Sequence, residues 1–463
     1  MVSTHTINNH SILRPITSFS IDNQRMKKAI LFFLTFLFIT RESIVAQRFL
    51  ADVDSSFYIK DTVRPVIKRF ANLRITGYIQ PQFQVASANG IESYEGGSFS
   101  AHSQSRFMLR RARVKIEYAL PSKTSGNPAA FFAFQVDGTE RGVAVRDMFL
   151  KLFETRKNKF SFTAGLFGRP FGYEVNLSSA YREMPERGRM SQILMPRERD
   201  IGAMVSFEPM NKKNKLSNFK FDLGLFNGQG LTGSTDFDSR KDLISRVYCK
   251  PYELNDFSIS GGLSFLNGGW KNGTKYVYKN GVGQNGDAIF IVDSTQANID
   301  EIAPRRYYGA DIQVKKEFKW GATEFRAEYW FGTQPGTSST STSPGVLPVA
   351  NGNPLPTYIR HFNGAFFYFL QNIINEKHQL LLKYDWYDPN VKVKKQQIGK
   401  PGTNLTPADI KFATSGIGYI YHLNKQTRVI LSYSMVSNEI TAMPGFASQL
   451  SDNVFTCRLH FIF

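Results

Sequence analysis

Polar and apolar residues alternate over many short segments from residue 73 to the end of the chain. The clearest segment runs from Arg110 to Tyr118, where charged residues at 111, 113, 115 and 117 alternate with apolar ones. A period of two residues predicts a half-buried β-strand. Sixteen such segments begin near residues 73, 106, 130, 145, 160, 201, 218, 242, 256, 306, 322, 360, 378, 412, 426 and 453. An even number of antiparallel strands is typical of a closed bacterial barrel, so we predict an all-β transmembrane barrel of about 16 strands.

The connections and the last residues favour the same fold. Short turns such as Thr155–Asn158 alternate with long segments, as periplasmic turns alternate with external loops. The final segment alternates up to an aromatic carboxyl terminus, Phe463. Two long segments, Asn267–Gly286 and Gly336–Ser343, are rich in small polar residues, and we expect them to be mobile loop tips.

The amino-terminal region has the pattern of a secretory signal. Met26 is followed by two lysines and 12 residues with an apolar core, and Ala46 offers a cleavage point. That core is too short to span a bilayer as a helix. We therefore predict a signal region over residues 1–46 with translation starting at Met26, a periplasmic lead-in over 47–72, and a barrel over 73–463.

One connection, residues 168–200, is unusually long and charged for a segment between two strands. Loops of this length are often functional. We expect it to fold into the barrel as a constriction loop, with Tyr181, Met184, Met190 and Met195 packing it against the wall. Its five acidic residues could pair internally with its basic ones, which are Arg169, Arg182, Arg187, Arg189, Arg197 and Arg199.

The charge on the polar strand faces gives a first indication of what such a barrel would conduct. A barrel of about 16 strands leaves an aqueous channel, so these faces should line water. They carry 14 basic and eight acidic residues, an excess of 14 − 8 = +6, in a chain of formal net charge +19. Arginine and lysine rings select anions, and the guanidinium fork matches phosphate oxygens. Opposed basic and acidic rows also occur in unselective channels, so a general porin remains an alternative.

Four segments resemble the phosphate-selective porin O and P family. They are Arg106–Arg113, Gly165–Gly172, Ser178–Met184 and Arg199–Gly202. The resemblance covers about residues 73–210, and the second half matches only in strand rhythm and in its final Phe. It implies a 16-stranded, trimeric outer-membrane channel for phosphate or related anions. The positions that match its selectivity residues are Arg110, Arg111, Arg113, Arg169 and Arg182.

We therefore expect an outer-membrane porin that favours phosphate or other small anions in passive diffusion. The expected pore-lining residues are Arg110, Arg111, Arg113, Lys115, Arg169 and Arg182, with Arg187, Arg189, Arg197 and Arg199 on the constriction loop. Expected partners are the solute anions, outer-membrane lipid and two further copies in a homotrimer. No cofactor, metal or nucleic acid is expected. A barrel enzyme is disfavoured because no histidine lies in a recognisable catalytic motif. An adhesive barrel with displayed loops is disfavoured because the long loops are not repetitive and because a filled lumen would need fewer strands.

Overall fold

The computed structural model describes residues 72–122, 127–211, 213–232, 236–450 and 452–463. The predicted signal region and all but the last residue of the lead-in lie outside these residues. The first strand begins at Leu73, where the sequence places the start of the barrel. Within the described residues, no helix is long and apolar enough to cross a bilayer.

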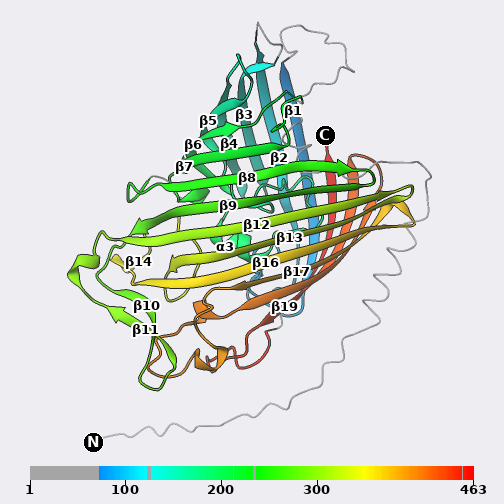
Figure 1. The fold of residues 1–463 in the computed structure, drawn as a ribbon. Helices are drawn as coiled ribbons and strands as arrows, with labels where there is room; N and C mark the ends of the chain where they lie inside the picture. Colours follow the sequence, from blue (N-terminus) through cyan, green and yellow to red (C-terminus); the bar gives the residue numbers. More distant parts are fainter. Residues whose placement is uncertain (1–71, 123–126, 212, 233–235, 451) are drawn as a thin grey trace, which may run out of the picture. The chain divides into compact units, whose positions relative to one another are not determined.

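A ring of antiparallel strands forms the body of the protein (Figure 1). The sheet contains 18 strands in the described residues, and 18 − 2 = 16 remain in the ring once the external hairpin β10–β11 is set aside. Strand β20 pairs with β1, as in Phe83 opposite Cys457, and this pairing closes the ring. Closure pairs the backbone groups internally, which a barrel in lipid requires. The ring strands are β1 Leu73–Ala86, β2 Ser105–Pro121, β3 Pro128–Thr139, β4 Gly142–Phe153, β5 Phe160–Gly168, β6 Arg199–Phe207, β7 Phe219–Phe226, β8 Asp242–Leu254, β9 Phe257–Lys271, β12 Ile302–Phe318, β13 Gly321–Gly336, β16 Thr357–Ile373, β17 Asn375–Asp388, β18 Phe412–His422, β19 Thr427–Asn438 and β20 Val454–Ile462.

The strand prediction is confirmed along the whole barrel. The largest difference between an expected and an observed start is four residues, at β12, expected near 306 and beginning at Ile302. The alternating segments were sufficient to locate the strands, because each strand has one face toward the interior of the barrel and one face away from it.

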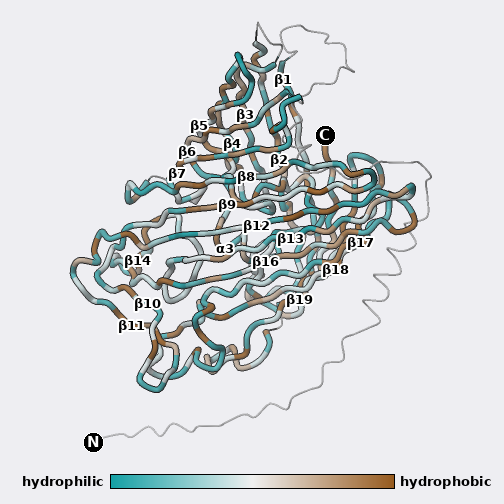
Figure 2. The backbone as a smooth tube through the Cα atoms, in the orientation of Figure 1, coloured by the Kyte–Doolittle hydropathy of each residue, from teal (hydrophilic) through white to brown (hydrophobic). Residues whose placement is uncertain are grey.

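The two faces of the strands differ in the way that the alternation predicts. Outward side chains such as Phe132, Leu150, Phe162, Leu223 and Leu382 are 41–46% exposed. We call this outward apolar surface the apolar belt. Figure 2 shows the alternation of hydrophilic and hydrophobic residues along the strands. Inward positions are largely polar, charged or packed beneath the loop between β5 and β6.

The external loops carry structure that the sequence did not predict. The hairpin of β10 (Val277–Val282) and β11 (Ala288–Asp293) adds to β16 in parallel. Phe290, Tyr358, Ile398, Leu405 and Ile410 form a small apolar core beside it. The remaining short elements are β14 Val349–Ala350, β15 Asn353–Pro354 and the 3₁₀ turns Gly230–Thr232, Gln296–Asn298, Lys395–Gln397 and Pro407–Asp409.

The two segments expected to be mobile tips are packed in part, and only Gln284–Gly286 and Ser338–Thr340 within them form exposed tips. The Asn267–Gly286 segment supplies the end of β9 and all of β10. In Gly336–Ser343, three polar residues (Thr337, Ser341 and Ser343) are buried. The Ser343 amide donates to the Ile193 carbonyl of the loop between β5 and β6. The composition of these segments did not reveal this packing, because Ser and Thr side chains in a loop can form hydrogen bonds with backbone groups as readily as with water.

Two β-bulges change which side chains point into the barrel. Gln80 of β1 lies opposite both Arg110 and Arg111 of β2, because the register shifts between Ile79 and Pro81. A second shift in the β3–β4 pairing leaves Arg146 as an extra residue beside Asp147. A bulge places two neighbouring residues against one partner and re-aims their side chains. Each bulge therefore adds an inward-facing arginine that strict alternation would have placed on the outer face.

Candidate pore and its inward loop

The segment Arg169–Glu198 between β5 and β6, which we call the inward loop, lies inside the barrel. Every residue of it is described, and only Arg197 is exposed. Its single helix, α3, spans Arg189–Leu194. A loop resting on one wall of a water-filled channel would expose its other side. The inward loop is instead packed on nearly all sides.

Apolar contacts fix the loop to one part of the wall. Phe171 packs edge-on against Trp330 at 4.7 Å and Tyr307 at 6.0 Å, measured between ring centroids. Met190 and Met195 belong to the same buried cluster, and Met184 lies in a second cluster with Phe366, Tyr368, Leu370 and Leu381. The predicted packing role of these three methionines is confirmed. Tyr181 is half-buried beside the second cluster.

Polar contacts tie the loop to the other strands around the ring. The Gly172 amide donates to Ser264 Oγ of β9 at 2.9 Å, and Tyr173 and Glu174 amides donate to the Glu328 carboxylate of β13. On the far side, Gln80 of β1 donates to the Ser179 carbonyl at 2.8 Å. Further contacts come from Arg326 on β13, Asp385 on β17, Arg428 on β19 and Arg458 on β20. The loop thus reaches across the lumen from one wall to the other.

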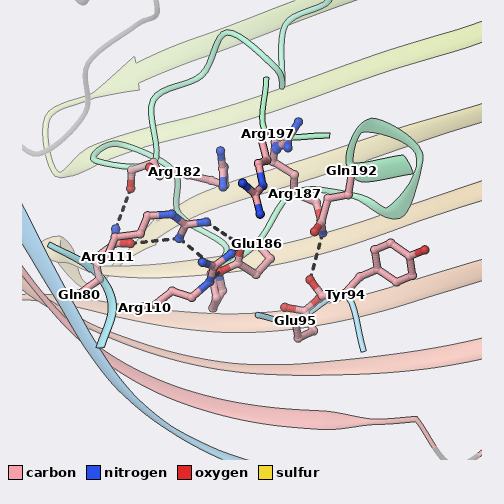
Figure 3. Close-up of polar contacts among 12 residues, drawn as sticks. Gln80, Tyr94, Glu95, Arg110, Arg111, Arg182, Glu186, Arg187, Gln192 and Arg197 are labelled. Carbon is pink, nitrogen blue, oxygen red and sulfur yellow. Dashed lines mark hydrogen bonds and ion pairs between the residues drawn. The ribbon is translucent and has the colours of Figure 1, made fainter. Parts of the chain in front are cut away.

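Glu186 is the most heavily bonded carboxylate of the loop (Figure 3). Arg110 donates to it through Nε at 2.8 Å and Nη2 at 2.9 Å. Arg111 donates through Nη1 at 3.2 Å and Nη2 at 2.8 Å, and Arg458 through Nη2 at 3.0 Å. Burial raises the pKa of Glu186, but these three guanidinium groups outweigh it and hold the pKa well below its usual range. Glu186 therefore stays ionised, with a local charge of 3 − 1 = +2.

Glu198, at the end of the loop, is the second anchor. It pairs with Arg146 of β4, with Arg187 at 3.2 Å and with Arg199 at 3.3 Å. Glu198 and its neighbour Arg197 both have positive φ, at 60° and 58°. That backbone is uncommon for residues other than glycine and is held only where the surroundings determine it. The bulge that turns Arg146 inward supplies one of those determinants.

Arg182 forms no ion pair with a carboxylate of the residues that the structure describes, although the charges of Glu186 and Glu198 act on it. It is 4% exposed, and its Nη2 donates to the Leu177 carbonyl at 3.3 Å. In the part of the chain that the structure describes, its Nε and Nη1 have no hydrogen-bond partner. Burial lowers the pKa of Arg182 to about 10, with Arg111 and Arg187 as further causes. Its guanidinium still carries a full charge at neutral pH, in a position that favours a negative ligand.

The other predicted residues have varied surroundings. Arg113 pairs with Asp137 at 2.9 Å, Lys115 with Glu117 and Arg199 with Asp147 at 2.9 Å. Arg169 is 1% exposed and donates to the carbonyls of Pro196 and Glu198, so it supports the base of the loop. Arg189 lies over the rings of Tyr94 and Phe412, and Arg197 is exposed. The structure thus brings Arg110, Arg111, Arg182 and Arg187 together and leaves Arg169 and Arg189 apart from them.

Charge is unevenly distributed around the lumen. We call one set of inward arginines the arginine wall: Arg110, Arg111 and Arg113 of β2, Arg146 of β4, Arg199 of β6 and Arg458 of β20. With Arg182, Arg187 and Arg197 of the loop this makes nine positive charges, against Asp137, Asp147, Glu186 and Glu198, so 9 − 4 = +5. The facing strands carry the buried carboxylates of Asp311, Glu324, Glu328 and Asp385, of which the first, second and fourth pair with Arg246, Arg326 and Lys383.

Sequence reasoning missed Arg146 as a lumen residue, although it is buried and bonded to the loop. The dipeptide Arg146-Asp147 between two alternating runs was the available signal, because the phase of the alternation changes there. A change of phase within a strand indicates a bulge.

Known proteins of similar structure were compared with this barrel. OprB of Pseudomonas putida matches with a TM-score of 0.53 and 10% identity, over 84% of this chain and 94% of that one. The outer-membrane channel DcaP of Acinetobacter baumannii matches with a TM-score of 0.50 and 13% identity, over 84% and 97%. No protein-family model and no curated protein matches the sequence. Identities this low establish a likeness of fold alone.

The fold can therefore be stated, while the solute is a separate question. The chain is a closed barrel of 16 antiparallel strands with an apolar belt and a buried inward loop. An outward apolar band is what such a barrel presents to lipid. The chain has the fold of an outer-membrane porin, and we assign it to the bacterial outer membrane.

Proposed function

We propose that this protein is an outer-membrane diffusion channel that favours small anions. The observation that carries the proposal is Arg182, a buried guanidinium beside the arginine wall that forms no ion pair with any carboxylate in the described residues. A buried charge is costly unless it is paired. A solute anion would supply the missing partner, and the excess of +5 around it would raise the local anion concentration.

The hydrogen-bond donors of the arginine wall indicate which class of anion the channel would favour. Guanidinium groups offer pairs of parallel N–H donors that match the oxygens of phosphates and carboxylates. Phosphate is therefore one member of a wider class of solutes. The resemblance of four segments to phosphate-selective porins supports it, and we extend the proposal to a homotrimer on the same grounds.

A general, weakly selective porin is the second candidate. It is favoured by the side of the ring opposite the arginine wall, where the carboxylates of Asp311, Glu324 and Asp385 pair with Arg246, Arg326 and Lys383 and leave little excess of positive charge. Opposed rows of charge create a transverse field and can leave little net preference between ions. Most of the arginine wall is also neutralised by Asp137, Asp147, Glu186 and Glu198.

The reversal potential of the purified protein in a planar bilayer under a KCl gradient decides between the two. The proposal predicts a sign that reports chloride permeating faster than potassium. A value near zero would favour the general porin, and the opposite sign would refute the proposal. Block of chloride current by added phosphate would then separate a channel that binds oxoanions from one that merely attracts anions.

A further inference from the structure

We propose that Arg110, Arg111 and Arg458 form a binding cradle for phosphate or carboxylate groups, and that Glu186 of the inward loop occupies it in this structure. The proposal deepens the proposed function and rests on it. It assigns Glu186 a role as a built-in competitor of the solute, in addition to its role in holding the loop.

The geometry of the cradle is that of an oxoanion site. Glu186 Oε1 accepts from Arg110 Nε, Arg111 Nη1 and Arg458 Nη2, and Oε2 accepts from Arg110 Nη2 and Arg111 Nη2. Two of the three arginines therefore present both members of a donor pair. Five charge-assisted hydrogen bonds converge on two oxygens, and a phosphate or a solute carboxylate offers acceptors of the same kind.

The cradle is held in place without Glu186. All three arginines belong to wall strands, and only Glu186 belongs to the loop. Gln80 of β1 accepts from Arg111 Nη1 at 3.1 Å, and Gln82 of β1 accepts from Arg458 Nε at 2.8 Å. Because these glutamines fix two of the guanidinium groups, withdrawal of Glu186 would leave a site that needs little reorganisation to bind another anion.

The bulge in β2 shows how specialised this arrangement is. Without it, Arg110 and Arg111 would point to opposite faces of the strand, because side chains alternate. The extra residue opposite Gln80 instead turns both into the lumen. A single guanidinium pairing with Glu186 would suffice to anchor the loop. Three guanidinium groups around one carboxylate leave an excess of two positive charges, which a multiply charged anion would neutralise better than Glu186 does.

Exchange of Glu186 for a solute anion would also affect the position of the inward loop. The inward loop reaches both walls, and Glu186 makes its ion pairs with the arginine wall at β2 and β20, beside hydrogen bonds from Arg113 to Ser179 and from Arg458 to the Pro185 carbonyl. A solute anion that passes along this wall meets the cradle where Glu186 is bound. Displacing Glu186 would weaken the hold of the loop on that wall, where the Pro185 carbonyl would still accept from Arg458 and Glu198 would still pair with Arg146. Occupancy of the cradle by the solute would therefore be coupled to loosening of the loop.

The test compares Glu186→Gln with Glu183→Gln by measuring how much inorganic phosphate halves the chloride current in a planar bilayer. Both substitutions remove one carboxylate from the same loop. Glu183 pairs with Arg326, which also has Glu324 as a partner, so its loss frees no triple-arginine site. We expect Glu186→Gln to lower the half-blocking concentration by about tenfold or more, equivalent to about 1.4 kcal/mol. Glu183→Gln should remain within about threefold of the unsubstituted protein.

The outcomes separate this inference from the proposed function. If the unsubstituted channel favours anions and Glu186→Gln leaves phosphate block unchanged, the cradle is refuted and the proposed function stands. If none of the proteins favours anions, the proposed function fails. If Glu186→Gln does not fold, Glu186→Asp keeps the charge and retracts the carboxylate by one methylene. The cradle predicts tighter phosphate block for Glu186→Asp as well, and an unchanged half-blocking concentration would overturn it.

Discussion

Replacing Arg182 by Gln should weaken anion selectivity without destabilising the barrel. Among the residues that the structure describes, Arg182 makes one long hydrogen bond, 3.3 Å to the Leu177 carbonyl, and its other buried nitrogens have no partner. It also lies close enough to Arg111 and Arg187 for both to lower its pKa. Its removal would relieve repulsion from these two arginines and would forfeit attraction from Glu186 and Glu198, but both carboxylates would keep their other arginine partners. We therefore expect the free energy of unfolding to change by less than about 1 kcal/mol, or to rise.

Arg326→Gln is the matched control for stability. Arg326 binds Glu183 through two hydrogen bonds of 2.8 and 2.9 Å, and its loss leaves a buried carboxylate without that partner. Removing one partner of a buried ion pair costs about 3–5 kcal/mol. Urea unfolding in detergent, followed by tryptophan fluorescence, measures both variants. Equal destabilisation by the two substitutions would refute the claim that Arg182 lacks a structural partner.

The effect of Arg182 on selectivity should be several-fold. A unit charge near 4 Å contributes about 4 kcal/mol at an effective dielectric of about 20, and salt in the lumen reduces this. A loss of about 1.4 kcal/mol would lower the chloride-to-potassium permeability ratio about tenfold. Reversal potentials under a KCl gradient measure it. An unchanged ratio in Arg182→Gln would mean that the permeating anion does not meet this guanidinium.

Three further predictions concern the loop and the outer surface. Gly172→Ala should loosen the start of the inward loop and raise single-channel conductance, because the residue has φ of 69° and an added Cβ would lie 2.7 Å from a Trp330 ring carbon. Acidification from about pH 8 to about pH 5 should leave conductance unchanged if Glu186 governs it. A carboxylate with a depressed pKa stabilises the folded state at every pH above its unfolded pKa, and this stabilisation is lost only as the pH falls through the lower pKa of the folded state. The pKa of Glu186 is held well below its usual range, so a step in conductance between these pH values would contradict the role of Glu186. Leu150→Arg should cost about 2–4 kcal/mol if the residue lies near the bilayer midplane, whereas Lys151→Arg, on the inward face, should be tolerated in the same urea assay.

The barrel was predictable from the sequence because the alternation of polar and apolar residues is a local pattern that recurs in every strand. Each strand alternates, so an error in one segment leaves the others intact, and the starts of all ring strands lie within four residues of expectation. The membrane-facing positions followed from the same alternation. The external hairpin β10–β11 was not predictable, because its partner strand β16 lies about 80 residues further along the chain, as in Tyr278 beside Tyr358. Pairing at such separation leaves no periodic mark in either segment.

The candidate site was predictable in composition but not in arrangement. Most of the arginines that gather at the site could be predicted from the charges of the inward loop and from the basic second strand. Which of them would be neutralised depends on contacts such as Arg458 with Glu186, which lie 272 residues apart. The inward aim of Arg146 depends on a bulge, which breaks the period used to assign faces. That no carboxylate of the described residues pairs with Arg182 depends on the three-dimensional arrangement of its neighbours, which the sequence does not indicate.

The most direct test of the account is to locate a permeant anion within the barrel. Crystals of the detergent-solubilised protein soaked in bromide would reveal bound anions by anomalous scattering. The account predicts a bromide site at the Arg182 guanidinium, on the side of Arg111 and Arg187, with Glu186 still bound by its three arginines. Bromide confined to other surfaces, or a heavy cation such as rubidium at Arg182, would contradict the claim that this wall attracts anions into the lumen.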